Sequence, residues 1–341
     1  MALLLNATLD DFAANFNWSS AWTAPDTSAV GYPNGDSFLE TLVDGTYHET
    51  ASANTTTSLS FAGSALYLYG VAGPSQGFYT LNLDNGATSA PLSAFASANS
   101  SNHLLWSAVD LAEGDHTLEI TNLGQNGDSS VGESLLIDYA LLTVVAGAEG
   151  ATLTNTTIED SDHARLTYEG SWTVNNDTRF SGNTSSYTNE QQSVSLKFNG
   201  SVVYVYGDTV DDHGLYTVDL DGVSKQYQGY TAELKIGTLM YFAAGLDESE
   251  HTLTITNDPG SAGTYFDLDS IVYTTPSAYA VNSPSSPSSS SVASRSGSPT
   301  SSGSPSSSST STPASEGSRA KAAFLTVLLL SVAVAALAGS A

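Results

Sequence analysis

The side chains best suited to ligand chemistry in this sequence are tyrosines with polar neighbours. Sugar recognition needs an aromatic face that stacks on the apolar side of a pyranose, together with fixed polar groups for the hydroxyls. Tyr227 and Tyr230 lie three residues apart in QYQGY, and Tyr47 lies in GTYHE. We predict that these three tyrosines and Tyr187 contact a glycan, with the pair in QYQGY contributing most.

An acidic segment, GDTVDDH, offers a second kind of chemistry through Asp208, Asp211 and Asp212. Calcium is a hard cation that takes several oxygen ligands, so these carboxylates form a candidate calcium site. The spacing is not that of an EF-hand, and a solvated acidic loop is the simpler interpretation. We therefore expect no cofactor, with calcium as the one that is possible.

A catalytic site is harder to assemble from the sequence. A glycoside hydrolase needs two carboxylates across a cleft, and other hydrolases need a nucleophile with a base and an oxyanion site. Asp267 and Asp269 share one strand face in FDLDS, but the aligned first half of the chain has Leu136 in place of Asp267. HExxH, phosphate-loop and dinucleotide motifs are missing, and cysteine is absent. We expect no catalytic residue and no enzymatic activity.

The charge balance excludes one class of partner. The chain has 35 acidic and 8 basic side chains, a formal net charge of -27. Such a surface repels phosphate backbones, so we expect no nucleic-acid partner. At 341 residues the chain is long enough for two self-sufficient domains with additional tails.

An internal repeat accounts for most of the length. LSFAGSALYLYG begins at Leu59 and matches LKFNGSVVYVYG beginning at Leu196, and GFYTLNLD matches GLYTVDLD at the same offset of 137 positions. Further on, HTLEITN from His116 matches HTLTITN from His251. We expect Leu59 to superimpose on Leu196 and His116 on His251, with both histidines in structural turns.

Within the matched blocks apolar residues recur at every second position, as in half-buried antiparallel strands. Short strands separated by Gly, Asn, Asp and Ser favour a sandwich or jelly roll. The predicted fold is all-β, with two tandem antiparallel β-sandwich (jelly-roll) domains at residues 1–148 and 149–279. Matched aromatic positions, Trp22 with Trp172 and Trp106 with Tyr241, are expected in the cores.

These blocks resemble tandem fungal cell-surface proteins whose domains are galactose-binding-like or carbohydrate-binding-module-like jelly rolls, followed by a Ser-rich stalk and a hydrophobic tail. In the second copy the resemblance runs from TIEDSDHARLTYEGSW through VSLKFNGSVVYVYG and HTLTITN to FDLDSIVY. The first copy departs from it by an insertion between Trp22 and Tyr47. The resemblance implies this fold, a surface location and a glycan ligand.

The composition changes sharply after Tyr279. Residues 280–321 are rich in Ser and Pro and are expected to form a disordered, O-glycosylated stalk. Residues 322–341 carry no charge and are expected to form a hydrophobic helix, either a GPI-attachment signal or a single transmembrane span. The opening MALLL is too short for a secretory signal, so we expect that the signal is missing from this gene model.

Eight N-x-S/T sequons also favour secretion. The predicted N-glycosylation sites are Asn6, Asn17, Asn54, Asn99, Asn155, Asn176, Asn183 and Asn199.

The main hypothesis is a non-enzymatic cell-surface glycoprotein that binds cell-wall or environmental glycans through its tandem domains. It would lie on the extracellular face of the plasma membrane or in the cell wall, with its C-terminal tail attached to the membrane. Two alternatives remain open: a structural coat or adhesion module without a small-ligand site, and a jelly-roll glycoside hydrolase.

Overall fold

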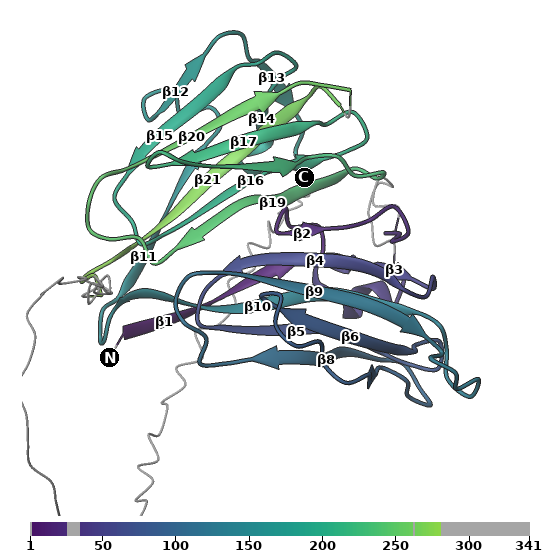
Figure 1. Ribbon diagram of the computed structural model, residues 1–341. Helices are drawn as coiled ribbons and strands as arrows, with labels where there is room; N and C mark the ends of the chain where they lie inside the picture. The colour runs from purple at the N-terminus through teal and green to yellow at the C-terminus, as the bar shows by residue number, and fades with distance from the viewer. Residues whose placement is uncertain (1, 26–34, 262, 281–341) are drawn as a thin grey trace, which may run out of the picture. The chain divides into compact units, whose positions relative to one another are not determined.

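The computed structural model describes residues 2–25, 35–261 and 263–280 (Figure 1). The predicted stalk, apart from Ala280, and the predicted hydrophobic tail lie outside the described residues. Within these ranges the helices are short 3-10 turns, and none is long and apolar enough to cross a membrane. All of these described residues belong to one compact unit.

The first copy contains ten strands and two 3-10 turns among the described residues. They are β1 (Ala2–Asp10), β2 (Phe16–Asn17), η1 (Leu39–Thr41), η2 (Val43–Gly45), β3 (His48–Thr50), β4 (Thr55–Ala62), β5 (Ala65–Ala72), β6 (Phe78–Leu83), β7 (Leu92–Ser93), β8 (Ser100–Ala108), β9 (Asp115–Gly124) and β10 (Leu135–Ala148).

The second copy follows nearly the same order, with an additional strand, β13, and a single 3-10 turn. Its elements are β11 (Leu153–Glu159), β12 (Leu166–Glu169), β13 (Thr173–Asn176), η3 (Ser181–Asn183), β14 (Thr184–Thr188), β15 (Ser193–Phe198), β16 (Val202–Thr209), β17 (Leu215–Leu220), β18 (Val223–Gln228), β19 (Lys235–Ala244), β20 (His251–Asp258) and β21 (Phe266–Pro276).

The strands form four separate antiparallel sheets, two from each copy. The first copy gives the orders β1-β10-β5-β8, with β3 on β10, and β2-β4-β9-β6-β7; Figure 1 shows β4, β9 and β6 as neighbours. The second copy gives β13-β14-β21-β16-β19, with β11 on β21, and β12-β15-β20-β17-β18.

This topology confirms the all-β class and corrects the predicted architecture. We expected two tandem jelly-roll sandwiches, and the four sheets instead correspond to a four-bladed, propeller-like arrangement. The physical reason is that a period of two identifies strands and their buried faces, but it does not specify how separate sheets are grouped. Within the first copy, Leu9 and Leu68 of one sheet share a core with Leu59 and Leu118 of the other.

Equivalent contacts recur in the two copies and confirm the register of the repeat. Leu59 pairs with Leu118 on the neighbouring strand, as Leu196 pairs with Leu253. Tyr79 donates its hydroxyl to a backbone carbonyl at 2.6 Å, as Tyr216 does in the second copy.

The predicted structural role of the two turn histidines is also confirmed. His116 Nδ1 lies 2.7 Å from Asp84 and His251 Nδ1 lies 2.6 Å from Asp221. Each aspartate also accepts the backbone N–H of the residue after its histidine.

The predicted core aromatics divide into two groups. Trp22 and Tyr241 are buried, as expected. Trp106 and Trp172 are half-buried and pack against the edges of their cores.

One asparagine in each copy joins several segments of irregular backbone. Asn122 is fully buried, and its side-chain amide nitrogen lies 3.0 to 3.2 Å from three carbonyl oxygens. Asn257 is also fully buried and has three carbonyl partners at 2.8 to 3.3 Å. Because a peptide carbonyl needs a donor when buried, these amides fix the loops that lie beside the strand ends.

Candidate functional site

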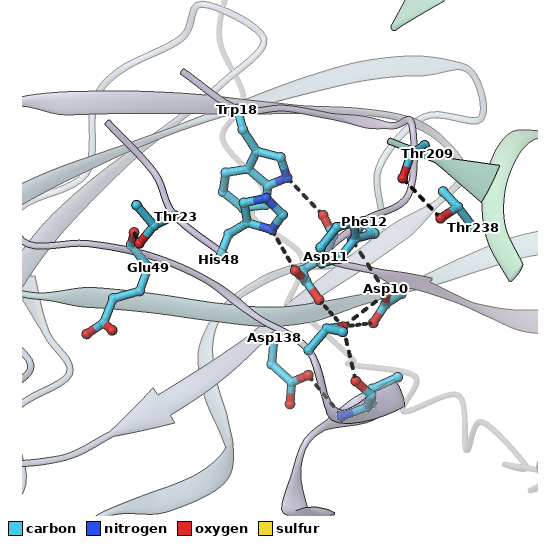
Figure 2. Close-up of polar contacts among 12 residues, drawn as sticks. Asp10, Asp11, Phe12, Trp18, Thr23, His48, Glu49, Asp138, Thr209 and Thr238 are labelled. Atoms are coloured by element: carbon cyan, nitrogen blue, oxygen red, sulfur yellow. Dashed lines mark hydrogen bonds and ion pairs between the residues drawn. The ribbon is translucent and has the colours of Figure 1, made fainter. Parts of the chain in front are cut away.

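A buried carboxyl group follows β1 in the first copy. Asp11 accepts a hydrogen bond from the Thr46 hydroxyl at 2.6 Å, and its other oxygen lies 2.5 Å from His48 Nδ1 (Figure 2). The Trp18 indole donates to the Asp11 carbonyl at 2.8 Å, and its ring stacks on His48. Burial raises the pKa of Asp11 to about 8 and lowers that of His48 to about 3, so both are neutral at neutral pH.

The second copy builds the same arrangement around Asp160. Thr184 donates to one carboxylate oxygen at 2.6 Å and Ser186 to the other at 2.8 Å, while the Tyr168 hydroxyl donates to the Asp160 carbonyl at 2.7 Å. Since both copies use this carboxyl group to bind a threonine hydroxyl and the carbonyl of the same residue to bind an aromatic side chain, Asp11 and Asp160 are structural residues.

Asp138 and Asp269 occupy aligned positions in the two copies, and they too are structural because each makes an equivalent backbone contact. Asp138 accepts the backbone N–H of Val43 in η2 at 3.0 Å, and Asp269 accepts a backbone hydrogen bond from Ser181 in η3. Burial raises the pKa of Asp138 to about 8 and that of Asp269 to about 7. Each carboxyl group therefore fixes a 3-10 turn.

The two copies differ at three neighbouring positions. The second copy has Asp208, His213 and Asp267, all buried, where the aligned residues of the first copy are Val71, Gln76 and Leu136.

The first copy fills these positions with uncharged groups. Val71 and Leu136 pack with Leu42, and the Gln76 side chain accepts the N–H of Leu136 at 3.0 Å. The fold is thus formed without any charge at this place.

In the second copy two of the three ionisable residues come from adjacent strands of one sheet, and His213 lies in the loop between β16 and β17. Asp267 lies on β21, between β14 and β16, and Asp208 lies near the end of β16. His213 Nε2 lies 3.0 Å from Asp208 Oδ1 without hydrogen-bond alignment, and its Nδ1 lies 2.9 Å from Asp212. Ser185 on β14 donates to Asp267 Oδ2 at 3.1 Å. We call Asp208, His213 and Asp267 the ionisable cluster.

The electrostatics of the ionisable cluster give its members different protonation states. Burial, reinforced by the charge of Asp208, raises the pKa of Asp267 to about 8. Burial alone would lower the pKa of His213, but Asp208 and Asp212 outweigh it and raise that pKa. At neutral pH Asp267 therefore keeps its proton, and the raised pKa of His213 favours the protonated form of its imidazole. Asp267 Oδ1 has no hydrogen-bond partner among the described residues.

Burying charged groups is costly, and the first copy shows that this fold does not require it. Ionisable groups with shifted pKa values are concentrated at functional sites. The ionisable cluster is therefore the candidate active site.

Tyr187 is the sequence-predicted ligand residue that lies beside the cluster. It pairs with Asp267 across β14 and β21, and its ring lies 6.0 Å from that of Tyr265. The half-buried ring of Tyr47 lies elsewhere, in the first copy, at an edge-on angle to Phe38.

The two tyrosines of QYQGY lie in different environments. Tyr227 is half-buried, stacks on Tyr216 at 5.7 Å and contacts Tyr241, and burial raises its pKa to about 12. Tyr230 is 46% exposed. Only Tyr230 therefore has a largely free ring.

The three aspartates of the candidate calcium site also differ in burial. Asp208 is buried against His213, whereas Asp211 and Asp212 are exposed. In the part of the chain that the structure describes, no three His, Cys, Asp or Glu side chains are arranged to hold a metal ion.

All eight predicted glycosylation asparagines have exposed side chains. Their exposure makes them accessible to modification.

Sequence reasoning missed His213 and set Asp267 aside because it aligns with Leu136. The signal that could have identified the site was the difference between the two copies at these aligned positions. Three ionisable residues replace uncharged ones at aligned positions, and the structure brings these positions together.

No protein-family model matches the chain. A curated protein, the A type blood alpha-D-galactosamine galactosaminidase of Flavonifractor plautii, is 25% identical over 228 residues, which are 66% of this chain. The chain spans about a fifth of the length of that relative, since the match covers 20% of it.

Similar solved structures include a Paenibacillus xanthan lyase, with 16% identity and a TM-score of 0.30, covering 79% of this chain and 26% of that one. A family 35 carbohydrate-binding module from Clostridium thermocellum has 13% identity and a TM-score of 0.27, covering 35% of this chain and 98% of that one. Carbohydrate-binding modules, the kind of structure that the resemblance implied, are thus among them.

The comparisons correct our functional expectation. We expected a non-enzymatic glycoprotein, whereas the curated relative is a glycosidase. Of the hypotheses left open by the sequence, the glycoside hydrolase is the one that this finding favours.

Proposed function

We propose that the chain is a carbohydrate-active enzyme, a glycoside hydrolase whose acid and base belong to the ionisable cluster of the second copy. The observation that carries the proposal is the contrast between the copies, because the fold is made in the first copy without these buried ionisable groups. The similarity to a galactosaminidase over 228 residues supports the class of reaction. It also suggests an α-linked galactosamine unit as the substrate.

The proposed chemistry assigns one role to each carboxyl group. Glycoside hydrolysis needs a protonated acid that donates to the leaving-group oxygen and a carboxylate on the other side of the bond. Asp267 keeps its proton at neutral pH because its pKa is raised to about 8. Asp208, whose Oδ1 lies 3.0 Å from His213 Nε2, is the proposed second carboxylate.

The overall reaction is balanced by one water molecule. The bond between the anomeric carbon and the leaving oxygen breaks, and that oxygen takes the Asp267 proton. Water supplies hydroxide to the anomeric carbon, and its remaining proton returns to the carboxylates. His213 acts as a positioning residue for Asp208, and the rings of Tyr187 and Tyr265 are the proposed aromatic contacts for the sugar.

The test uses the full chain and p-nitrophenyl α-D-galactosaminide. The key variant replaces all three residues by those of the first copy: Asp208→Val, His213→Gln and Asp267→Leu. Because the first copy folds with these residues, the variant should keep its circular dichroism spectrum and lose hydrolysis. Asp267→Asn alone should lower kcat by at least about 100-fold, as expected for loss of a general acid.

The matched control is Asp138→Asn, which changes a buried acid of similar pKa in the first copy. It should alter stability but leave kcat of the folded protein unchanged. Wild-type protein that hydrolyses no α- or β-galactosaminide, or a triple variant that keeps full activity, would refute the proposal.

A further inference from the structure

A polar groove of about 260 Å³ lies on the outer face of the first copy, away from the ionisable cluster. Asn17, Ser58 and Glu119 line it and are directly opposed on β2, β4 and β9. Directly opposed residues on antiparallel strands point to the same face of the sheet. The three side chains therefore form a row across about 10 Å, or two strand spacings.

Trp18 forms a rigid part of the groove. Its indole N–H donates to the Asp11 carbonyl at 2.8 Å, and Phe16 and His48 both stack on its ring, with centroids at 4.9 and 4.2 Å. Since these neighbours occupy the ring faces, Trp18 is not available as a stacking platform. Recognition in this groove must rest on hydrogen bonds and charge.

The groove is specific to the first copy. The equivalent row in the second copy is Thr167, Ser195 and Thr254, which has hydroxyls but neither an amide nor a carboxylate. Glu119 is exposed, and no Lys, Arg or His of the described ranges forms an ion pair with it. An anionic carboxylate beside an amide and hydroxyls fits a ligand that carries both a cation and hydroxyl groups.

We propose that this groove binds an amino sugar with a free ammonium group, with Glu119 paired to the ammonium and Asn17 and Ser58 hydrogen-bonded to hydroxyls. The carbohydrate class rests on the proposed function, whereas the preference for a cation rests on Glu119 and on the net charge of -27. A strongly acidic protein raises the local concentration of cationic ligands and excludes anionic ones. The groove is thus a second subsite, separate from the ionisable cluster.

The test is a calorimetric or NMR titration of the full, unglycosylated chain with galactosamine, N-acetylgalactosamine and galactose at low ionic strength. Galactosamine should bind at least tenfold more tightly than the two neutral sugars. Its affinity should fall when salt is added, because an exposed ion pair is screened. Equal affinity for galactose would overturn the proposal, because the ammonium group would then contribute nothing to binding. Ethanolamine that competes with galactosamine equally well would also overturn it, because the sugar hydroxyls would then contribute nothing.

The variants separate this site from the proposed active site. Glu119→Thr installs the residue of the second copy and should lower galactosamine affinity at least tenfold, whereas the exposed control Glu113→Gln should not. The triple variant of the ionisable cluster should keep this binding. A wild-type protein that binds galactosamine but hydrolyses no substrate would refute only the proposed function. A Glu119→Thr variant that binds galactosamine as the wild type does would refute only the proposed binding site in the groove.

Asn17 is also a predicted glycosylation site, which adds an independent test. A glycan on Asn17 would occupy the groove, so glycosylated protein should not bind galactosamine. Ser19→Ala removes the sequon while keeping the Asn17 amide, and should restore binding to protein made in a glycosylating host. Ser19 also lines the groove, so the control is Ser19→Ala made in a host that does not glycosylate. Failure of the rescue while this control binds galactosamine would contradict the assignment of Asn17 to the site.

Discussion

Replacing Asp267 with asparagine should make the protein more stable at alkaline pH. The wild-type carboxyl group is buried, and its pKa is raised from 3.8 to about 8 by burial and by the charge of Asp208. The folded state therefore holds a proton that the unfolded state releases above pH 4. The stability that this group gives at low pH is lost as the pH rises from about 4 to about 8.

The size of the effect follows from the pKa shift. At 1.36 kcal/mol per pKa unit, the wild type loses at most about 4 kcal/mol between pH 5 and pH 8 through this group. Local relaxation around the ionised carboxylate reduces this, and we expect about 2 kcal/mol. Asparagine has no proton to lose, and its side-chain oxygen can still accept from Ser185, which lies at 3.1 Å from Asp267.

The assay is urea unfolding of the wild type and Asp267→Asn at pH 5, 6, 7 and 8, followed by circular dichroism. Taking the difference between the two curves cancels the contributions of Asp11, Asp138 and Asp269, which remain in both proteins. The difference should grow with pH in favour of the variant, and the Tm advantage at pH 8 should be about 4 °C. Glu113→Gln, which changes an exposed acid, should give a curve parallel to that of the wild type. A similarly parallel curve for Asp267→Asn would refute a raised pKa at this position.

Three further predictions concern the shared framework, the tyrosines and the tail. Thr46→Val and Thr184→Val should each cost about 1 to 3 kcal/mol in urea unfolding, because each leaves a buried carboxyl oxygen without its donor; a large cost in one copy only would contradict their structural equivalence. Tyr227→Ala should lower stability by about 3 kcal/mol because its ring packs on Tyr216 and Tyr241, whereas Tyr230→Ala should stay within about 0.5 kcal/mol; equal effects would place both rings in one environment. If residues 322–341 direct GPI attachment, a phosphatidylinositol-specific phospholipase C should release the protein from cells, and release by detergent alone would favour a retained span.

The repeat made much of the fold predictable from the sequence. The alternation around Leu59 and Leu196 identified strands and their buried faces, and the common offset placed both copies in one register. The grouping of the strands into four sheets was not predictable in this way, because pairings such as β10 with β1, β3 and β5 join residues far apart in the chain. The alternation of residues along one strand does not indicate which distant strand pairs with it.

The candidate site was less predictable than the fold. Asp208 and Asp267 were visible as acids, but their separation in the sequence hid that they belong to adjacent strands. Tyr227 was selected because its neighbours are polar, yet alternate residues of a strand face opposite sides, so polar neighbours do not exclude a packed ring. Comparing the copies position by position separates structural residues from candidate functional ones better than residue type does.

The buried asparagines of the two copies make the fold sensitive to the chemical state of two side-chain amides. Hydrolysis of the Asn122 or Asn257 amide would replace a hydrogen-bond donor by a carboxylate facing the same backbone carbonyls, which are acceptors. Each event would add negative charge to a fully buried position and release the adjoining loops. Hydrolysis of either amide should therefore lower the stability of the molecules that carry it, and these can be recognised by a mass increase of about 1 Da, the difference between NH₂ and OH, in the peptides that contain Asn122 or Asn257.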